Sequence, residues 1–277
     1  MELVEDGQKL MIKKIVYKMI QSNRILMKLF VLINNNFQGD WIEANGMLIR
    51  KNRFTVNGIN NSIKISEQCS IQNVIAQIKG DENLITIDDT ELNGNSDRRI
   101  FILGDNNQIT IGKGCKLTNI SFFISGNNNR IYISENCSGI DVEFHIEQNN
   151  NEIFIGKNTT MHGRGTRTVH FALDEGTKIV VGEDCMFSND IQIRSSDSHS
   201  IVDLQGKRLN SAKDIVIGNH CWIGLRSMLL KGTEIADNTM VAGGSICTKK
   251  YNEKNVILAG NPAKVVKKNI NWDRKFL

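Results

Sequence analysis

A repeat with a period of six residues constrains the fold more than any other feature of this sequence. An aliphatic or small apolar residue occupies every sixth position in one segment, namely Ile217, Ile223, Leu229, Ile235, Val241 and Cys247. A small residue follows four positions after each of the first five, namely Cys221, Ser227, Thr233, Thr239 and Ser245. Each hexapeptide then supplies a short strand and a corner, and three hexapeptides complete one turn of a triangular coil. The pattern predicts an all-β solenoid with these residues pointing inward.

The same pattern of an apolar anchor and a residue four positions later recurs upstream at intervals of 22 to 26 residues. The anchors are Ile65, Ile87, Ile111, Ile133, Ile155 and Val181, and the residues four positions later are Cys69, Glu91, Cys115, Cys137, Thr159 and Cys185. Asparagine clusters such as Asn127 to Asn129 precede the strands. We therefore expect coils of hexapeptides with about four extra residues at one corner. Glu91 breaks the pattern, and the cysteines are expected to be buried packing residues.

Composition agrees with many tight corners and excludes several classes of protein. The 277 residues include one proline and 23 glycines, so glycine and asparagine must make the turns. The six cysteines form no C-x-x-C pair, which argues against a zinc ribbon or a disulfide framework. The net charge of +4 is too small to indicate nucleic acid as a partner. Eight basic and two acidic residues lie between Lys249 and Leu277, a segment suited to a compact polyanion.

The two ends of the chain depart from the repeat. Residues 8–33 have apolar residues at helical spacing with lysines between them, which predicts an N-terminal helical cap within residues 1–45. A basic helix on a membrane surface is the alternative. No apolar run reaches the roughly 20 residues of a membrane span, so we expect a cytoplasmic chain, at the inner face of the membrane under that alternative. The solenoid is predicted over 46–258, and a C-terminal cap with a short helix over 263–270 within 259–277.

A long polar insertion marks the candidate site. Val181 and Ile217 are 36 residues apart, twice the interval between Ile217 and Ile235, and the excess falls in residues 194–214. This segment contains His199. Imidazole gains and loses a proton near neutral pH, so a histidine on a loop beside a rigid solenoid is a candidate general base. Either Asp197 or Asp203 could orient it.

Four motifs together resemble the acetyl-CoA-dependent O-acetyltransferases of the hexapeptide-repeat family. They are Asp197-Ser-His-Ser, Asp214 to Gly224, Val241 to Lys249, and Ala259-Gly-Asn-Pro-Ala-Lys264. The likeness is nearest to enzymes that acetylate sugars and bacterial surface polysaccharides, including sialic acid capsule, and covers about residues 180–270. It implies a left-handed parallel β-helix, acetyl-CoA as co-substrate, no metal, a sugar or polysaccharide acceptor, and a homotrimer with active sites between chains.

The resemblance also assigns roles. His199 matches the catalytic base, with direct attack of the acceptor hydroxyl on the thioester, and Trp222, Asp197 and Arg194 match the acceptor and acyl site. At Leu225 some relatives have serine, so a side-chain donor to the oxyanion is absent here, and either the amide alone serves or the oxyanion is held elsewhere. The residues that match the cofactor site are Leu225, Gly243, Gly244, Thr248, Lys249, Lys264 and Lys267.

Three other readings stay open at this stage. Carbonic anhydrases on this fold hold a metal with three histidines across a trimer interface, and His199 and His220 are 21 residues apart. A carbonic anhydrase, however, would need neither the basic tail nor the Ala259–Lys264 turn to hydrate carbon dioxide. A non-enzymatic scaffold needs only the regular core. A serine-type amino-acid O-acetyltransferase is the third, although the N-terminal coils do not resemble that family's helical domain.

Overall fold

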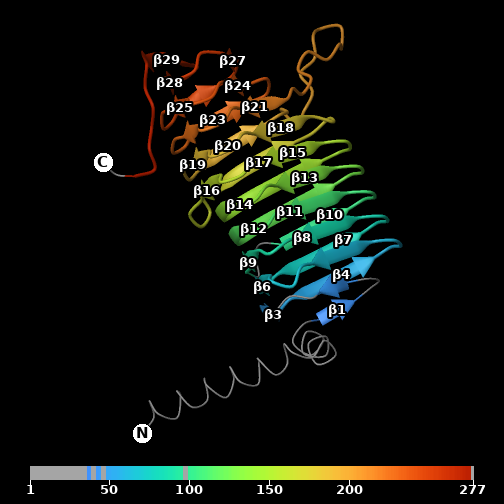
Figure 1. The fold of residues 1–277 in the computed structure, drawn as a ribbon. Coiled ribbons are helices and arrows are strands. Elements are labelled where there is room, and N and C mark those ends of the chain that lie inside the picture. Colours follow the sequence, from blue (N-terminus) through green and yellow to red (C-terminus); the bar gives the residue numbers. More distant parts are fainter. Residues whose placement is uncertain (1–35, 39–41, 45–47, 96–98, 276–277) are drawn as a thin grey trace.

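The molecule is an all-β solenoid of about nine turns with parallel strands (Figure 1). The computed structural model describes residues 36–38, 42–44, 48–95 and 99–275, and these residues contain no helix. None of them therefore forms a helix able to span a bilayer. The predicted helix over 8–33, and with it the membrane-surface alternative, lies outside the described residues. Strands β1 and β2 precede residue 46, where the repeat predicts the solenoid to begin.

The strands form three faces. Face 1 contains β3 (Leu48–Arg50), β6 (Ser70–Gln72), β9 (Glu91–Asn93), β16 (Thr160–His162), β19 (Met186–Phe187), β22 (Trp222–Ile223), β25 (Met240–Val241) and β28 (Val256–Gly260). Face 2 contains β1 (Asn36–Gln38), β4 (Arg53–Asn57), β7 (Ile75–Lys79), β10 (Arg99–Leu103), β17 (Val169–Leu173), β20 (Ile191–Arg194), β23 (Met228–Leu230) and β26 (Ile246–Cys247). Two longer strands, β12 (Lys116–Ser125) and β14 (Ser138–Glu147), run from face 1 onto face 2. Face 3 is a ten-stranded sheet of β2 (Ile42–Ala44), β5 (Ser62–Ile65), β8 (Leu84–Ile87), β11 (Gln108–Ile111), β13 (Arg130–Ile133), β15 (Glu152–Ile155), β18 (Lys178–Val181), β21 (Ile215–Ile217), β24 (Glu234–Ile235) and β27 (Lys250–Tyr251).

Three edges separate the faces, and each is named here by what lies on it. The glycine edge, between faces 1 and 2, carries Gly243 and Gly244. The ladder edge, between faces 2 and 3, carries the buried asparagines described below. The tail edge, between faces 3 and 1, carries His220 and the C-terminal residues 269–275.

The interior confirms the period-six prediction. The six anchors from Ile217 to Cys247 are at most 3% exposed, and the five small residues are at most 1% exposed. All six cysteines are buried and free, as the repeat predicts. In the coil that Glu91 interrupts, the buried small residue is Thr90, one position earlier, and Glu91 points outward. This corner is one residue shorter, and Asp89, directly before Thr90, takes the left-handed conformation that Asn136 and Asn158 take at the same place in later coils.

A ladder of buried asparagines explains the extra residues of the earlier coils. The amides of Asn83, Asn107, Asn129 and Asn151 each donate to the side-chain oxygen of the asparagine one coil before, starting from Asn61. Their Nδ2 groups also bond backbone carbonyls at the corner, so these buried polar groups are satisfied. A glycine opens most of these corners because the coils approach closely. A Cβ at Gly80 would lie 2.1 Å from the Gly104 carbonyl oxygen.

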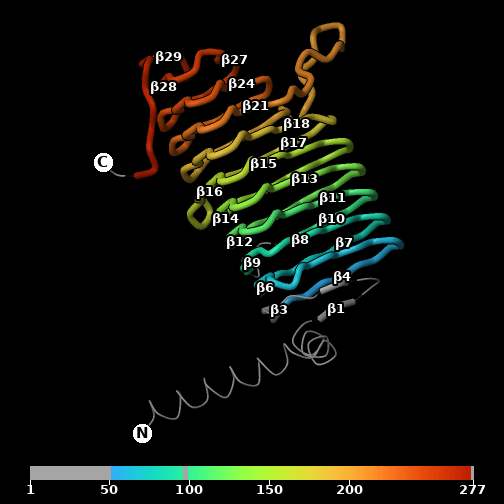
Figure 2. Tube along the Cα trace, in the orientation of Figure 1, coloured from blue at the N-terminus to red at the C-terminus, as the bar shows by residue number. Residues whose placement is uncertain are grey.

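The predicted C-terminal helix is wrong. Ala263–Lys268 is instead strand β29, antiparallel to β28. Strand β28 is the last strand of face 1, and its outer side has unpaired backbone groups that a returning strand satisfies. The β-branched Val265 and Val266 suit that pairing. Beyond β29 the chain turns back along the tail edge, seen as the red segment that descends beside the stack in Figure 2.

Candidate active site

The insertion predicted at residues 194–214 is a loop on the ladder edge. It leaves the end of β20, at Arg194, and returns at the start of β21, at Ile215. Figure 2 shows it in orange, standing away from the stack. The asparagine ladder leads to this point, since Thr177 donates its N–H to the Asn151 side chain and shares a 2.6 Å hydroxyl contact with Ser195. The loop therefore replaces the corner that would have continued the ladder.

The base of the loop is held by Asn210, which is buried. Its Nδ2 group donates to the Asp197 carboxylate at 2.7 Å and to the His199 carbonyl oxygen at 2.8 Å, and its Oδ1 accepts the Ile201 N–H at 2.7 Å. Lys231, at the same edge one coil on, donates to Asp197 and to the Asn210 carbonyl. These contacts fix the backbone of His199 relative to the solenoid.

Asp197 is engaged with the scaffold and not with the histidine. Hydrogen bonds from Lys231 and then Asn210 hold the pKa of its carboxyl below the usual range, so it is ionised. Asp203 lies at the loop tip, where it accepts the backbone N–H groups of Gln205 and Lys207 and closes a turn. Among the described residues neither carboxylate bonds the His199 ring, which is exposed to solvent. The alternative between Asp197 and Asp203 as orienting groups is therefore not resolved within one chain.

Arg194 stands at the foot of the loop. Its Nη2 lies 3.3 Å from the Ser198 hydroxyl, directly before His199 in the sequence. Ser198 has a φ of 62°, a sparsely populated conformation for a residue with a side chain, which turns the chain so that His199 leaves the stack. The structure thus brings Arg194, Asp197 and His199 together at one edge.

The predicted thioester-binding residues lie at another edge. Leu225, Gly243 and Gly244 occupy two stacked corners of the glycine edge, where the Gly244 N–H donates to the Leu225 carbonyl at 2.7 Å. A Cβ at Gly224 would lie 2.6 Å from the Val241 oxygen, so this corner must be glycine. The Leu225 side chain is 43% exposed and offers no hydrogen-bond donor.

The tail lysines divide into two groups. Lys250, Lys254 and Lys268 pair with carboxylates. The three predicted phosphate ligands, Lys249, Lys264 and Lys267, are exposed and have no ion pair among the described residues. Lys249 lies on the ladder edge after Thr248, with its Nζ 5.7 Å from the Tyr251 ring centroid, whereas Lys264 and Lys267 lie on β29. Lys275, the remaining lysine of the tail, is also exposed and has no ion pair among the described residues.

Trp222 lies on face 1 under the C-terminal segment. Its Nε1 reaches the Ser188 hydroxyl at 3.5 Å, and its ring centroid is 6.0 Å from that of Trp272. His220 is stacked on Trp272, with ring centroids 4.3 Å apart, and its Nδ1 lies 2.7 Å from the Asp184 carboxylate. Burial alone raises the pKa of Asp184, but hydrogen bonds from His220 and Arg274 outweigh it and lower that pKa.

The predicted site residues do not converge within one chain. Leu225 and Lys231 stand at the two ends of β23, six residues apart, which at about 3.3 Å per residue is at most about 20 Å. Lys231 contacts the base of the His199 loop. The histidine and the glycine-edge amides are thus separated by the width of face 2, and Trp222 lies on face 1.

Two residues of the site escape the sequence pattern. Asn210 carries no periodic signal, and Lys231 occupies an ordinary corner position after Leu229. Their roles arise from contacts between residues far apart in sequence, for which a single sequence contains no cue. Trp272 and Arg274 are similar, since Arg274 bonds Thr160, 114 residues earlier, and the Cys185 carbonyl, 89 residues earlier.

The metal-lyase reading finds no support in the arrangement of His199 and His220. Within the described part of a single chain, the group of three potential metal ligands is Glu143, His145 and His170, which includes neither. His220 faces Asp184 and the Trp272 carbonyl.

Known proteins resemble this chain in both sequence and structure, although no family model matches it. It is 35% identical over 199 residues to the polysialic acid O-acetyltransferase of Neisseria meningitidis, covering 72% of this chain and 89% of that protein. The polysialic acid O-acetyltransferase of Escherichia coli O1:K1 / APEC is 38% identical over 97 residues, 35% of this chain and 31% of that protein.

Two solved structures share the fold over most of their length. The polysialic acid O-acetyltransferase OatWY superposes with a TM-score of 0.64 at 30% identity, covering 81% of this chain and 92% of that one. The polySia-specific acetyltransferase NeuO gives a TM-score of 0.53 at 27% identity, covering 80% of this chain and 89% of that one.

Proposed function

This chain belongs to the hexapeptide-repeat acetyltransferase family, and we propose that it transfers an acetyl group from acetyl-CoA to a hydroxyl of polysialic acid or a closely similar sugar polymer. The acceptor follows from the names of its relatives and the donor from the family. We also propose that the coil is left-handed, as the family resemblance implies. What supports the activity most directly is the one long insertion of the C-terminal coils, which carries an exposed histidine on a fixed base.

In the proposed reaction His199 is the general base. Its imidazole takes the proton from the acceptor hydroxyl while that oxygen attacks the thioester carbonyl. The new C–O bond forms a tetrahedral intermediate, the C–S bond then breaks, and the proton passes from the imidazole to the departing CoA sulfur. Both substrates are bound at once, and no covalent acyl-enzyme forms. Asn210 and Lys231 are positioning residues, since they hold the backbone from which His199 projects.

Acetyl-CoA is proposed to lie along the glycine edge. The backbone N–H groups near Leu225 and Gly243 would face the thioester and the pantetheine arm, and fixed donors of this kind are each worth about 3 to 4 kcal/mol to a tetrahedral oxyanion. Leu225 supplies no hydroxyl, so the amide alone serves there. The phosphates would bind Lys264 and Lys267 on β29 together with Lys249, which lies on the ladder edge and would reach them from the neighbouring chain of the assembly proposed below. None of the three has an ion pair among the residues described.

The separation of the site across face 2 supports a homotrimer. One ladder edge and one glycine edge, up to about 20 Å apart in a chain, meet only if neighbouring chains pack edge to edge. We propose that His199 of one chain completes the cleft that holds acetyl-CoA on its neighbour. A monomer with full activity in analytical ultracentrifugation and kinetic assay would contradict this assembly.

An acceptor screen tests the activity. Purified protein is incubated with acetyl-CoA and, in separate reactions, polysialic acid, monomeric sialic acid, galactosides or serine, and released CoA thiol is measured. We expect thiol release with polysialic acid, and an acetyl ester on the polymer by mass spectrometry. Thiol release with serine alone would indicate an amino-acid O-acetyltransferase. If none of the acceptors gave thiol release, a non-enzymatic scaffold would be favoured.

A further inference from the structure

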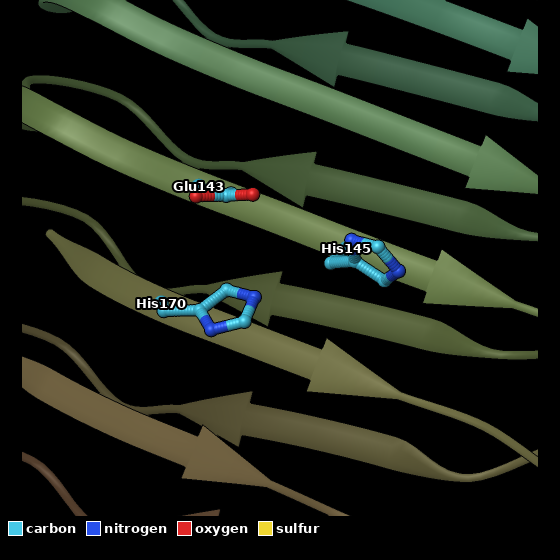
Figure 3. A group of neighbouring side chains, drawn as sticks. All are labelled: Glu143, His145 and His170. Carbon is cyan, nitrogen blue, oxygen red and sulfur yellow. The ribbon is translucent and has the colours of Figure 1, made fainter. Parts of the chain in front are cut away.

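A group of metal-ligating side chains lies on the outer surface of face 2, outside the proposed active site. Glu143 and His145 project from β14 and His170 from the next strand, β17 (Figure 3). One ligand atom from each lies within 4.8 Å of the others. The next strand of this face is β20, which leads into the His199 loop.

Strand geometry brings the three together. Glu143 and His145 are two residues apart, so they point to the same side of the sheet. His170 stands directly opposite Glu143, and the residue opposite His145 is the small Ala172, which leaves room beneath the imidazole. On its other side the His145 ring stacks on Phe123 with centroids 4.6 Å apart. The ring is thereby held in place.

The ring nitrogens of both histidines are oriented by neighbours. His170 Nδ1 lies 3.0 Å from the Gln192 amide oxygen, which can only accept, so Nδ1 carries the proton and Nε2 the lone pair. His145 Nε2 lies 3.3 Å from the Glu147 carboxylate, which leaves the lone pair on Nδ1. Histidines that bind metal are typically oriented in this way, through the nitrogen that does not ligate.

His170 has an unsatisfied atom. Its Nε2 is buried and has no hydrogen-bond partner in the described part of the chain. Such atoms are rare in folded proteins. Arg194, near His170 on β20, is the positive charge that opposes a cation here, and Glu143 and Glu147 offset it.

We propose that Glu143, His145 and His170 bind one divalent transition-metal ion, with Zn²⁺ the best match. Two imidazoles and one carboxylate suit zinc, whereas calcium and magnesium prefer oxygen ligands alone. Bonds of about 2.0 to 2.2 Å in a tetrahedral site place donors about 3.4 Å apart, so atoms at the outer limit of 4.8 Å need to approach by about 1.4 Å. The ion would clamp β14 to β17 just after the segment 163–168 interrupts the regular coil at the glycine edge. This proposal is independent of the acetyltransferase activity.

Zinc titration tests the site directly. Full-length protein without a histidine tag is stripped with EDTA, exchanged into metal-free buffer and titrated with Zn²⁺ by isothermal calorimetry. We expect one ion per chain and a higher melting temperature with Zn²⁺ than without. Gln192→Leu, which removes the partner of Nδ1, should weaken binding roughly 10- to 100-fold. Loss of a ligand in His170→Ala or in the nearly isosteric Glu143→Gln should weaken it more.

His162→Ala is the matched control, because His162 lies on the neighbouring strand β16, bonds Ser138 and belongs to no group of three potential ligands in the described part of the chain. It should bind Zn²⁺ as the wild type does. Circular dichroism of each variant without metal establishes that it is folded. The proposal is overturned if the wild type shows no saturable binding, or if folded Glu143→Gln and His170→Ala bind Zn²⁺ with unchanged affinity, since the ion would then occupy another place.

Discussion

Two regions of the solenoid have different corners at the ladder edge. The corners of one region stabilise the coil, and those of the other leave side chains that can hold the proposed active site. In residues 51–177 the ladder edge is filled by asparagines that bond one another from coil to coil. In residues 215–258 the same edge has short corners whose outward residues, Lys231 and Lys249, are free of the ladder. A side chain that is bonded to the neighbouring coil in this way is unavailable to a ligand. The His199 loop begins where the ladder ends, at Ser195.

The largest expected effect comes from a charged substitution in the apolar interior that both regions share. Ile223 is fully buried in the short-corner region, and Ile223→Asp would bury an unpaired carboxylate. We expect loss of the folded state, measured by circular dichroism and gel filtration. The exposed neighbour Arg226→Asp is the control and should fold. A folded Ile223→Asp protein of normal stability would mean that the anchors do not point inward.

The second prediction concerns His199, on which the proposed chemistry of the second region depends. General-base assistance is typically worth about 10²- to 10⁴-fold, so His199→Ala should lower kcat by that factor on a verified acceptor. Acetyl-CoA binding should be nearly unchanged, because the imidazole acts on the acceptor hydroxyl. His162→Ala serves as the histidine control. His220→Ala is unsuitable as a control, because His220 anchors the C-terminal segment.

The third prediction tests the ladder of the first region. Asn129→Ala leaves the buried N–H of Asn151 without its acceptor, and a buried unsatisfied group costs about 1 to 3 kcal/mol. Urea unfolding should show a destabilisation in that range. Arg130→Ala, the adjacent exposed residue, should change stability by less than about 0.5 kcal/mol. Equal effects of the two changes would show that the ladder is not a stabilising device.

The fourth prediction concerns the unpaired lysines at the C-terminal end. Changing Lys249, Lys264 and Lys267 to glutamine should raise KM for acetyl-CoA and leave that for the acceptor little changed, with a smaller effect at high salt. The matched control changes the three paired lysines, Lys250, Lys254 and Lys268, to glutamine. If the control raises that KM as much, the positive charge acts in general and not through a phosphate site.

The sequence predicts the interior well because a period of six admits one arrangement, in which every anchor points inward. It fails at Ala263–Lys268, where six residues have no decisive pattern and the open side of β28 selects a strand. His199 is a candidate from the sequence because the insertion that carries it doubles the coil length. Asn210 and Lys231 are not, since their roles depend on contacts that only the folded coil creates.

The smallest expected effect is that of changing Asp197, which tests whether this carboxylate only holds the loop or also assists the proposed general base His199. Lys231 and Asn210 lower the pKa of Asp197. The contact therefore stabilises the loop fully at pH values above the ordinary aspartate pKa, and it is lost only as the pH falls through the lowered pKa. Any loss of activity between pH 5 and 7 therefore does not come from release of the loop. Asp197→Asn should lower kcat by no more than about fivefold, because an exposed ion pair is worth at most about 1 kcal/mol.

The pH profile of Asp197→Asn then decides which part the carboxylate plays. If Asp197 only fastens the loop, the variant keeps the acid limb of the wild-type kcat profile, whereas His199→Ala loses it. Lys231→Met should behave like Asp197→Asn, since it removes the other half of the same contact. If Asp197→Asn instead shifts or abolishes the acid limb while Lys231→Met does not, Asp197 acts on the imidazole in the assembled trimer. The comparison of the two regions would then fail at this residue, because a group bound to the scaffold would be taking part in the chemistry.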